Sequence, residues 1–127
     1  MVKRMITSVA GNGEDVNPMR VLCVENRPDY MATLKRGLER TGCEVLTANT
    51  VKEAFGLLTT ELVEGVLLEY DLPGATGAAV RTDMKLLRPD VPILVFNGIS
   101  SQTPFLLRFF TAYLRNRRDE DGDGDAS

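Results

Sequence analysis

Short apolar runs alternate along the chain with segments in which apolar residues recur every three or four positions. The runs cover 20–24, 44–48, 66–68 and 93–96, and the helical spacing covers 28–42, 50–62 and 77–87. Short unbroken runs bounded by polar loops are typical of buried strands, whereas the longer spacing indicates amphipathic helices. Strands that alternate with helices at these lengths predict βαβ units, right-handed crossovers and a parallel sheet.

The stretch from Val66 to Gly77, VLLEYDLPGATG, combines a strand, a carboxylate and a turn. An apolar strand ends in Glu69, and Pro73-Gly74 then make a turn before Gly77 opens the next helix. Because ligands of open α/β sheets bind beyond the carboxyl ends of the strands, Glu69 is a candidate site residue. We expect Glu25-Asn26 and Asn97, which follow two other apolar runs, to lie beside it.

The last third of the chain allows two interpretations. Residues 105–114 are apolar on all sides of a single helix, or they form a short helix followed by a strand at 110–114. We favour the second, because its aromatic residues suit a strand that would complete a five-stranded sheet. The final helix would then be missing, as a natural loss or as a truncation. Phe105, Phe109 and Phe110 would leave an apolar surface for a partner or for self-association.

The length of 127 residues suits a single domain. The polar and charge patterns predict a flexible N-terminal arm at 1–18, a folded domain at 19–116 and a disordered acidic tail at 117–127. The tail matches only the first half of a calcium-binding loop and lacks the distal glutamate, so we expect no calcium binding there.

The amino-acid composition argues against several classes of partner and activity. The net charge of −3 gives no reason to expect nucleic acid or an anionic membrane as a partner. No apolar segment is long enough to cross a bilayer or to act as a secretory signal, so we expect a cytoplasmic protein. The chain has no His, which removes the usual general base and metal ligand and argues against a hydrolytic enzyme. Cys23 and Cys43 lack metal or redox spacing and are expected to fill the core.

Carboxylates at neighbouring strand ends, with a hydroxyl and a lysine nearby, can bind Mg²⁺ and accept a phosphoryl group. In this order of elements, the phrases VLCVENRP, VLLEYDLPGATG, PILVFNG and AYLRN resemble the receiver domain of two-component response regulators, from about Arg20 to Asn116. The resemblance implies an α/β, flavodoxin-like open parallel sheet with strand order 2-1-3-4-5.

The resemblance also implies an altered site. Glu25 stands at the first acidic position of the metal pair, but Asn26 replaces the partner aspartate. Glu69 stands in place of the phosphate-accepting aspartate, where it is similar to a phosphate mimic in reach and charge and is not expected to be phosphorylated. Asp71 is two residues further on, at a position that the family uses for its main chain, and its side chain is expected at the rim.

The remaining positions of the family pattern are changed as well. Asn97 replaces the switch Ser or Thr, and Asn116 replaces the lysine if 110–114 is a strand. Tyr113 stands where receivers often have an aromatic residue that moves with the switch, although a partly buried anchor is an equal interpretation.

These changes lead to a functional hypothesis. We expect a degenerate, stand-alone receiver that is not an enzyme, has lost or weakened Mg²⁺ binding, and acts without phosphorylation. Its partner would be another signalling protein, such as a sensor kinase or an output protein, and a homodimer is a further expectation. The alternative is a flavodoxin-like domain that binds a small molecule or a nucleotide at its strand ends.

Overall fold

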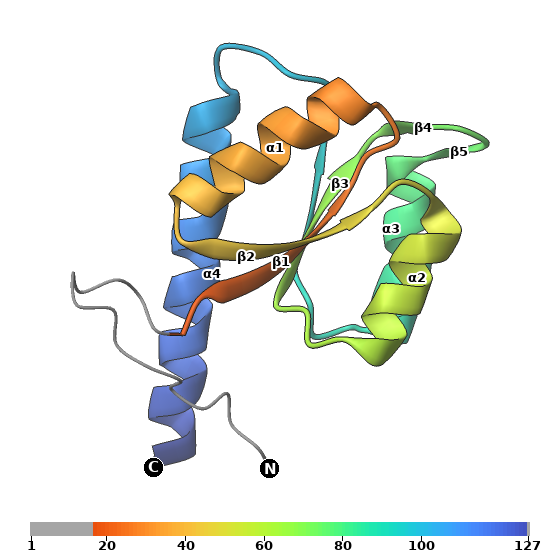
Figure 1. The fold of residues 1–127 in the computed structure, drawn as a ribbon. Coiled ribbons are helices and arrows are strands. Elements are labelled where there is room, and N and C mark those ends of the chain that lie inside the picture. The colour runs from red at the N-terminus through yellow and green to blue at the C-terminus, as the bar shows by residue number, and fades with distance from the viewer. Residues whose placement is uncertain (1–16, 127) are drawn as a thin grey trace.

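The computed structural model describes residues 17–126 of the chain. Most of the predicted N-terminal arm, residues 1–18, lies outside this part. The described elements alternate strictly at first and end in one long helix (Figure 1). In chain order they are β1 (Met19–Val24), α1 (Pro28–Arg40), β2 (Cys43–Ala48), α2 (Val51–Thr60), β3 (Gly65–Glu69), β4 (Asp71–Leu72), β5 (Ala75–Thr76), α3 (Gly77–Leu87), β6 (Ile93–Phe96) and α4 (Thr103–Ala126).

The described strands form a four-stranded parallel sheet in the order β2-β1-β3-β6, with β4 and β5 as a separate two-stranded hairpin. In the register, Val24 pairs with Leu68 of β3, and Glu69 pairs with Phe96 of β6. The predicted fold class and the order of the first four strands are therefore confirmed. Because all four strands are parallel, their carboxyl ends lie at one edge of the sheet.

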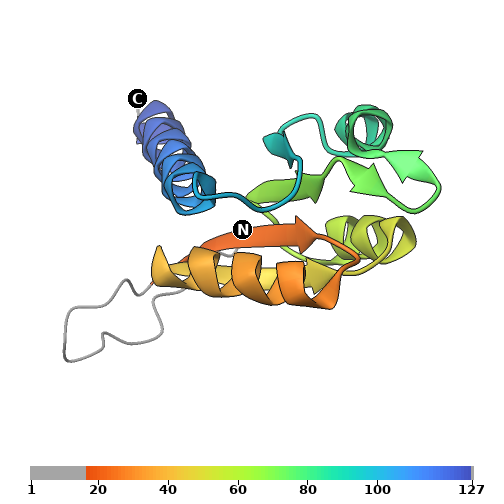
Figure 2. The same ribbon diagram turned by 90° about the horizontal axis from the view of Figure 1, so that it is seen from above.

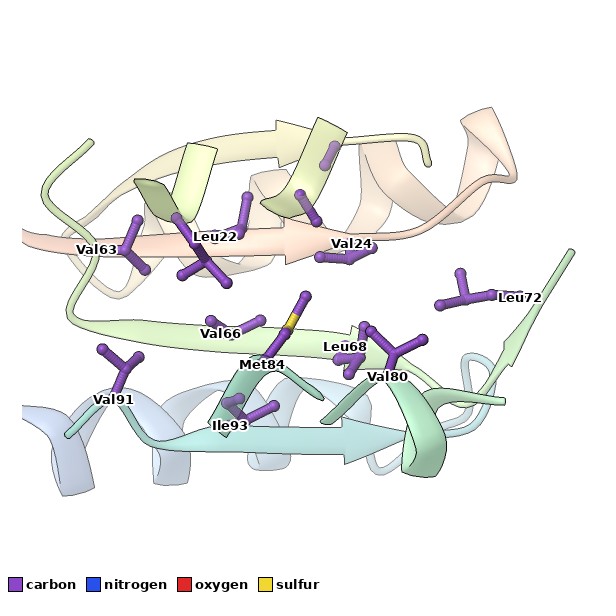
Figure 3. Packing of buried hydrophobic residues seen from close by; sticks show 13 residues of the cluster. Leu22, Val24, Val63, Val66, Leu68, Leu72, Val80, Met84, Val91 and Ile93 are labelled. Carbon is purple, nitrogen blue, oxygen red and sulfur yellow. The ribbon is translucent and has the colours of Figure 1, made fainter. Parts of the chain in front are cut away.

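Helices cover both faces of the sheet: α1 and α4 pack on one face, and α2 and α3 on the other (Figure 2). Figure 3 shows the apolar layer between the sheet and helices α2 and α3, in which Met84 of α3 packs against Val66 and Ile93. The strands of this sheet are covered on both sides, and this explains why their sequences are continuous apolar runs without alternation. Cys23 and Cys43 are buried free thiols in the layer under α1 and α4, as expected.

Local sequence signals set the loops around the strand ends. The β4–β5 hairpin turns at Pro73-Gly74, where Gly74 has φ of 81°, a left-handed conformation that favours glycine. The side-chain oxygen of Thr76 then accepts a hydrogen bond from Ala79 N at 3.2 Å and caps α3. Thr50 caps α2 in the same way, with Glu53 N as the donor.

The expected strand at 110–114 is wrong, because these residues belong to α4. The apolar residues form the buried face of this helix: Leu107, Phe110 and Leu114 pack in the layer shared with α1 and β1. Phe105 and Phe109, on the opposite side of the helix, are each 61% exposed. The segment was ambiguous because both sides of one helix are apolar although only one of them is buried.

The prediction that a final helix is missing is also wrong. Helix α4 covers the sheet face beside α1, and it extends over 117–126, where we expected a disordered tail. Two arginines explain why the ordered part runs past 116. Arg118 contacts Glu64 and the carbonyls of Asn17 and Pro18, while Arg117 donates to the carbonyl of Asp90 at 2.9 Å. These contacts attach the middle of α4 to the start of β1 and to the loop before β6.

Within residues 17–126, no helix is both long and apolar enough to cross a membrane.

Candidate functional site

Two glutamates are buried at the carboxyl ends of the central strands. Glu25 directly follows β1, and Glu69 is the last residue of β3; both side chains have 0% exposure. Since β1 and β3 are adjacent and parallel, the two carboxylates point to the same place. Burial of a charged group costs free energy unless the group is paired and hydrogen-bonded, so the surroundings of these carboxylates must supply a cation.

Arg27 supplies that cation. Its Nε lies 3.1 Å from Glu25 Oε2, and its Nη2 lies 3.2 Å from Glu25 Oε1 and 2.8 Å from Glu69 Oε1. One guanidinium therefore bridges both buried carboxylates, in a planar arrangement of donors that suits carboxylate oxygens. The two glutamates that the sequence placed at neighbouring strand ends are joined through this side chain.

The main chain and an aromatic ring hold Arg27 in place. Arg27 N donates to Glu25 Oε2 at 2.9 Å, so that both the main chain and the side chain of Arg27 bind the same carboxylate. The guanidinium carbon lies 4.0 Å from the centre of the Tyr30 ring, in a cation–π contact. Hydrogen bonding to Glu25, together with the nearby carboxylate charges, raises the pKa of Arg27 above its ordinary value. The bridging group is thus a permanent cation.

Glu69 also accepts two hydrogen bonds from the main chain. Gly98 N donates to Oε1 at 3.1 Å, and Asp71 N donates to Oε2 at 2.8 Å. With Arg27 Nη2, both oxygens of Glu69 have donors, and neither oxygen is open to solvent. The side chain of Asp71 is exposed, in agreement with its expected place at the rim, while its main-chain N–H faces the carboxylate.

Gly77 lets the loop close over the strand end. A Cβ at this position would lie 2.5 Å from the carbonyl oxygen of Glu69 and 2.7 Å from Tyr70 Cα. These are main-chain atoms that cannot move without moving β3, so the position requires glycine. The close approach fixes the hairpin and thereby the N–H of Asp71 that binds Glu69.

Residues 21–112 match the family model described as the response regulator receiver domain, which covers most of the chain. The chain belongs to this family. The receiver is 35% identical over 86 residues to the transcriptional regulatory protein PrrA of Mycobacterium tuberculosis, a match that covers 68% of the chain and 37% of PrrA. The chain therefore spans well under half the length of that relative.

Two solved structures of the response regulator TrrA from Thermotoga maritima have the same fold. TrrA in complex with Mg²⁺ and BeF is 25% identical, with a TM-score of 0.60 over 72% of this receiver and 79% of that chain. TrrA in complex with the histidine kinase ThkA is 27% identical, with a TM-score of 0.60 over 65% of this receiver and 71% of that chain. Membership of this family favours the signalling hypothesis over a small-molecule or nucleotide site.

The side chains of the other predicted site residues take no part in the contacts that bridge the glutamates. Asn26 is half-buried in the loop beside Arg27, and Asn97 is exposed after β6, where it is the neighbouring Gly98 that donates to Glu69. Asn116 and Tyr113 are exposed on α4. Helix α4 begins near the carboxyl ends of the strands and runs away from them (Figure 1). Because the expected strand is a helix, Asn116 does not follow a strand and is not among the groups that bind Glu69.

Arg27 occupies the carboxylate oxygens that a Mg²⁺ ion at this site would need. Mg²⁺ requires several oxygen ligands in octahedral geometry, including carboxylates that are free to bind it. Here both carboxylates bind a guanidinium, and among the side chains of residues 17–120 no group of three or more His, Cys, Asp or Glu could hold a metal.

Arg27 is the residue that the sequence interpretation missed. It lies in the loop after β1, and the family pattern assigns it no role. The available signal was chemical: an arginine two residues after a carboxylate that must be buried at a strand end is within reach of that carboxylate and its neighbour.

Proposed function

We propose that this receiver is a signalling module that is not phosphorylated at Glu69 and that acts by binding another signalling protein. The carrying observation is the bridge from Arg27 to Glu25 and Glu69. A receiver that accepts a phosphoryl group needs a nucleophile that its donor can reach and a cation that is free to bind the incoming group. In this chain the carboxylate oxygens and the cation already bind each other.

Glu69 supports a second part of the proposal, in which the receiver holds a single state. Its carboxylate places a negative charge one methylene further from the main chain than an aspartate would, in the direction in which an added phosphate would extend. The N–H groups of Asp71 and Gly98 bind its oxygens, so the loops after β3 and β6 are tied to a negative charge that is always present. A fixed charge of this kind removes the need for a phosphorylation step to order these loops.

Lost Mg²⁺ binding is a third part of the proposal. The support is that a guanidinium lies between Glu25 and Glu69, and that Asn26 provides an amide where the family pattern has a second carboxylate. Divalent cation binding would have to displace Arg27 from both glutamates, which would leave the arginine without its partners.

The proposed partner class follows from relatives. In a solved complex, TrrA, a response regulator of the same fold, is bound to the histidine kinase ThkA. A sensor kinase or an output protein is accordingly the partner class that we propose for this receiver.

Phosphorylation can be tested directly by incubating the chain with acetyl phosphate and Mg²⁺ and measuring the intact mass. We expect no phosphoryl adduct on the wild type, and the same result for the variant Glu69→Gln. A receiver with a complete site, such as TrrA, serves as the positive control in the same buffer. An adduct on the wild type that is absent from Glu69→Gln would overturn the proposal.

A further inference from the structure

The outer edge of β6 has no neighbouring strand within the described residues. Strand β6 ends the sheet order and pairs with β3 on one side. Val66 N donates to the carbonyl of Pro92 at 3.0 Å, and Tyr70 N donates to the carbonyl of Phe96 at 2.7 Å. Because peptide groups alternate between the two sides of a parallel strand, Ile93 and Val95 direct their N–H and C=O groups away from β3. Apart from the carbonyl of Ile93, which accepts a hydrogen bond from Arg81, these groups form an open edge that can pair with another strand.

A groove lies along this edge. Helices α3 and α4 flank β6 on the two faces of the sheet, and the edge of β6 lies between them (Figure 2). The groove has a volume of about 450 Å³. Arg81 and Lys85 of α3 line one wall, Phe109, Tyr113 and Arg117 of α4 line the other, and Leu94 contributes to the floor. The groove lies beside β6, at the position of the fifth strand that the sequence predicted.

The α4 wall is apolar and exposed. Phe109 and Tyr113 are spaced by one helical turn, and they are 61% and 45% exposed. An exposed aromatic pair next to an open strand edge is an unusual combination for a surface that only contacts water, because each feature by itself favours association. Side chains of an added strand would cover this pair.

Three cations line the groove, and each donates to a main-chain carbonyl. Arg81 Nε donates to the carbonyl of Ile93 at 3.3 Å, and Lys85 Nζ donates to the carbonyls of Pro89 and Val91 at 3.0 and 2.8 Å. Arg117 likewise donates to a main-chain carbonyl. Among the side chains of residues 17–120, none of these three cations forms an ion pair with a carboxylate.

Asp90 is the acidic side chain that lines the groove, and it is already paired. Arg88 contacts it at 3.3 Å, and this hydrogen bond lowers the pKa of Asp90 below its ordinary value. The groove therefore combines an open strand edge, an aromatic wall and a surplus of positive charge.

We propose that the outer edge of β6 binds an extended acidic segment of a partner protein, which adds to the sheet as a fifth strand. The N–H groups of Ile93 and Val95 and the carbonyl of Val95 would form the main-chain ladder, and the carbonyl of Ile93 would keep its hydrogen bond from Arg81. Apolar side chains at alternate positions of the segment would pack against Phe109 and Tyr113, and its carboxylates would pair with the cations of α3 and α4. This surface is separate from Glu69, so the inference does not depend on the state of that site.

Charge argues against a second copy of this chain as the occupant. Pairing of two β6 edges around a twofold axis would bring Arg81, Lys85 and Arg117 of one copy next to the same residues of the other. Like charges brought together in this way oppose association, whereas an acidic segment neutralises them. The main-chain edge is also better suited to a peptide than to a small molecule, because its donors and acceptors repeat along the strand.

A display library of random decapeptides tests the proposal, with the wild-type chain as the target. We expect enriched peptides in which acidic residues alternate with apolar ones. The variant Val95→Pro removes an outward N–H and leaves the ladder to β3 complete, so it should no longer bind the enriched peptides. The double variant Arg81→Glu/Arg117→Glu should weaken a selected peptide by about tenfold or more. The control Arg36→Glu/Lys52→Glu makes the same charge change at exposed positions of α1 and α2 and should keep the affinity.

The outcomes separate the possible occupants. Enrichment of basic peptides, equal retention by Val95→Pro, or no enrichment at all contradicts the proposal. Sedimentation of the wild type that reveals a dimer, together with a monomer for Val95→Pro, would identify a second copy as the occupant and would also contradict it. The charge variants keep the test valid if the proline variant does not fold, because neither arginine takes part in the sheet ladder or in the buried core.

Discussion

Arg27 and Glu69 are separated by 42 positions in the sequence, yet Arg27 Nη2 lies 2.8 Å from Glu69 Oε1. The same guanidinium binds Glu25, which is two positions before it. A cation from the loop after β1 therefore neutralises charge at the ends of both central strands. This link between two loops is the feature on which the stability of the strand ends and the proposed absence of metal both depend.

Removal of the arginine should give Mg²⁺ access to the site. In Arg27→Ala/Asn26→Asp, the two buried glutamates lose their cation and gain a third carboxylate beside them. We expect added Mg²⁺ to raise the melting temperature of this variant by about 5 °C at a concentration about tenfold above its Kd. The wild-type melting temperature should not change. A differential scanning experiment with NaCl at equal ionic strength is the control, and an equal rise for the wild type would contradict the role given to Arg27.

Gly37 of α1 should not tolerate a methyl group. A Cβ there would overlap the buried side chain of Leu107 on α4. We expect Gly37→Ala to destabilise the fold by about 1–3 kcal/mol in urea denaturation, although alanine is the better helix former. Gly56 of α2 is the matched control, because nothing lies within 4 Å of its Cβ position. Gly56→Ala should stabilise the fold by about 0.5–1 kcal/mol. In a Leu107→Ala background the clash is gone, so adding Gly37→Ala should destabilise the fold less than it does in the wild type.

Cys23 should make the fold sensitive to alkaline pH. Burial, with a smaller contribution from the charge of Glu25, raises the pKa of the Cys23 thiol from 9.0 to about 12. The folded state then keeps a proton that the unfolded state releases, so this contribution to stability is complete below pH 9 and is lost as the pH rises from 9 towards 12. The loss should approach about 1.4 kcal/mol per pH unit.

The measurement is urea denaturation between pH 8 and pH 11, an interval that spans about two units above the unfolded thiol pKa. We expect a shallower fall in stability for Cys23→Ala than for the wild type. Val21→Ala truncates another buried side chain of β1 without removing an ionisable group, and it should keep the wild-type slope. Parallel pH profiles for Cys23→Ala and the wild type would disprove the assignment.

Arg118 should stabilise the docking of α4. It lies 2.8 Å from Glu64 and donates to the carbonyls of Asn17 and Pro18. These charge-assisted hydrogen bonds are partly exposed, so we expect Arg118→Ala to cost about 1–2 kcal/mol in denaturation. Arg108→Ala, an exposed position on the same helix, should change stability by less than about 0.5 kcal/mol. Equal effects of the two substitutions would show that Arg118 has no special role.

The sequence predicted the elements that are buried on both faces or on one clear stripe. The strand at 93–96 was found because its apolar run is continuous, and α3 was found because Val80 and Met84 share one buried face. Helix α4 was misread because the exposed Phe109 and Tyr113 hide the periodicity of its buried face. An exposed aromatic stripe has no counterpart in simple amphipathic patterns, and a strand was then the more economical interpretation.

The candidate site was predicted in part. Glu25 and Glu69 were placed together because parallel strands bring their carboxyl ends to one edge. The contact between Arg27 and Glu69 depends on a side-chain rotamer and on the path of a loop, and neither is encoded in local periodicity. The same holds for the main-chain donors of Asp71 and Gly98, which are set by the approach of Gly77 to β3.

The guanidinium between the strand ends is attached to the chain by covalent bonds, and this has a consequence for how the site responds to its surroundings. A diffusible ion leaves its ligands when it is chelated or diluted, whereas the local concentration of Arg27 is the same in every buffer. If Mg²⁺ binding is lost as proposed, the charge balance of Glu25 and Glu69 is independent of the cellular supply of divalent metal. Under the proposed function, the amount of this protein, set by its synthesis and degradation, would be the quantity that its partner reads.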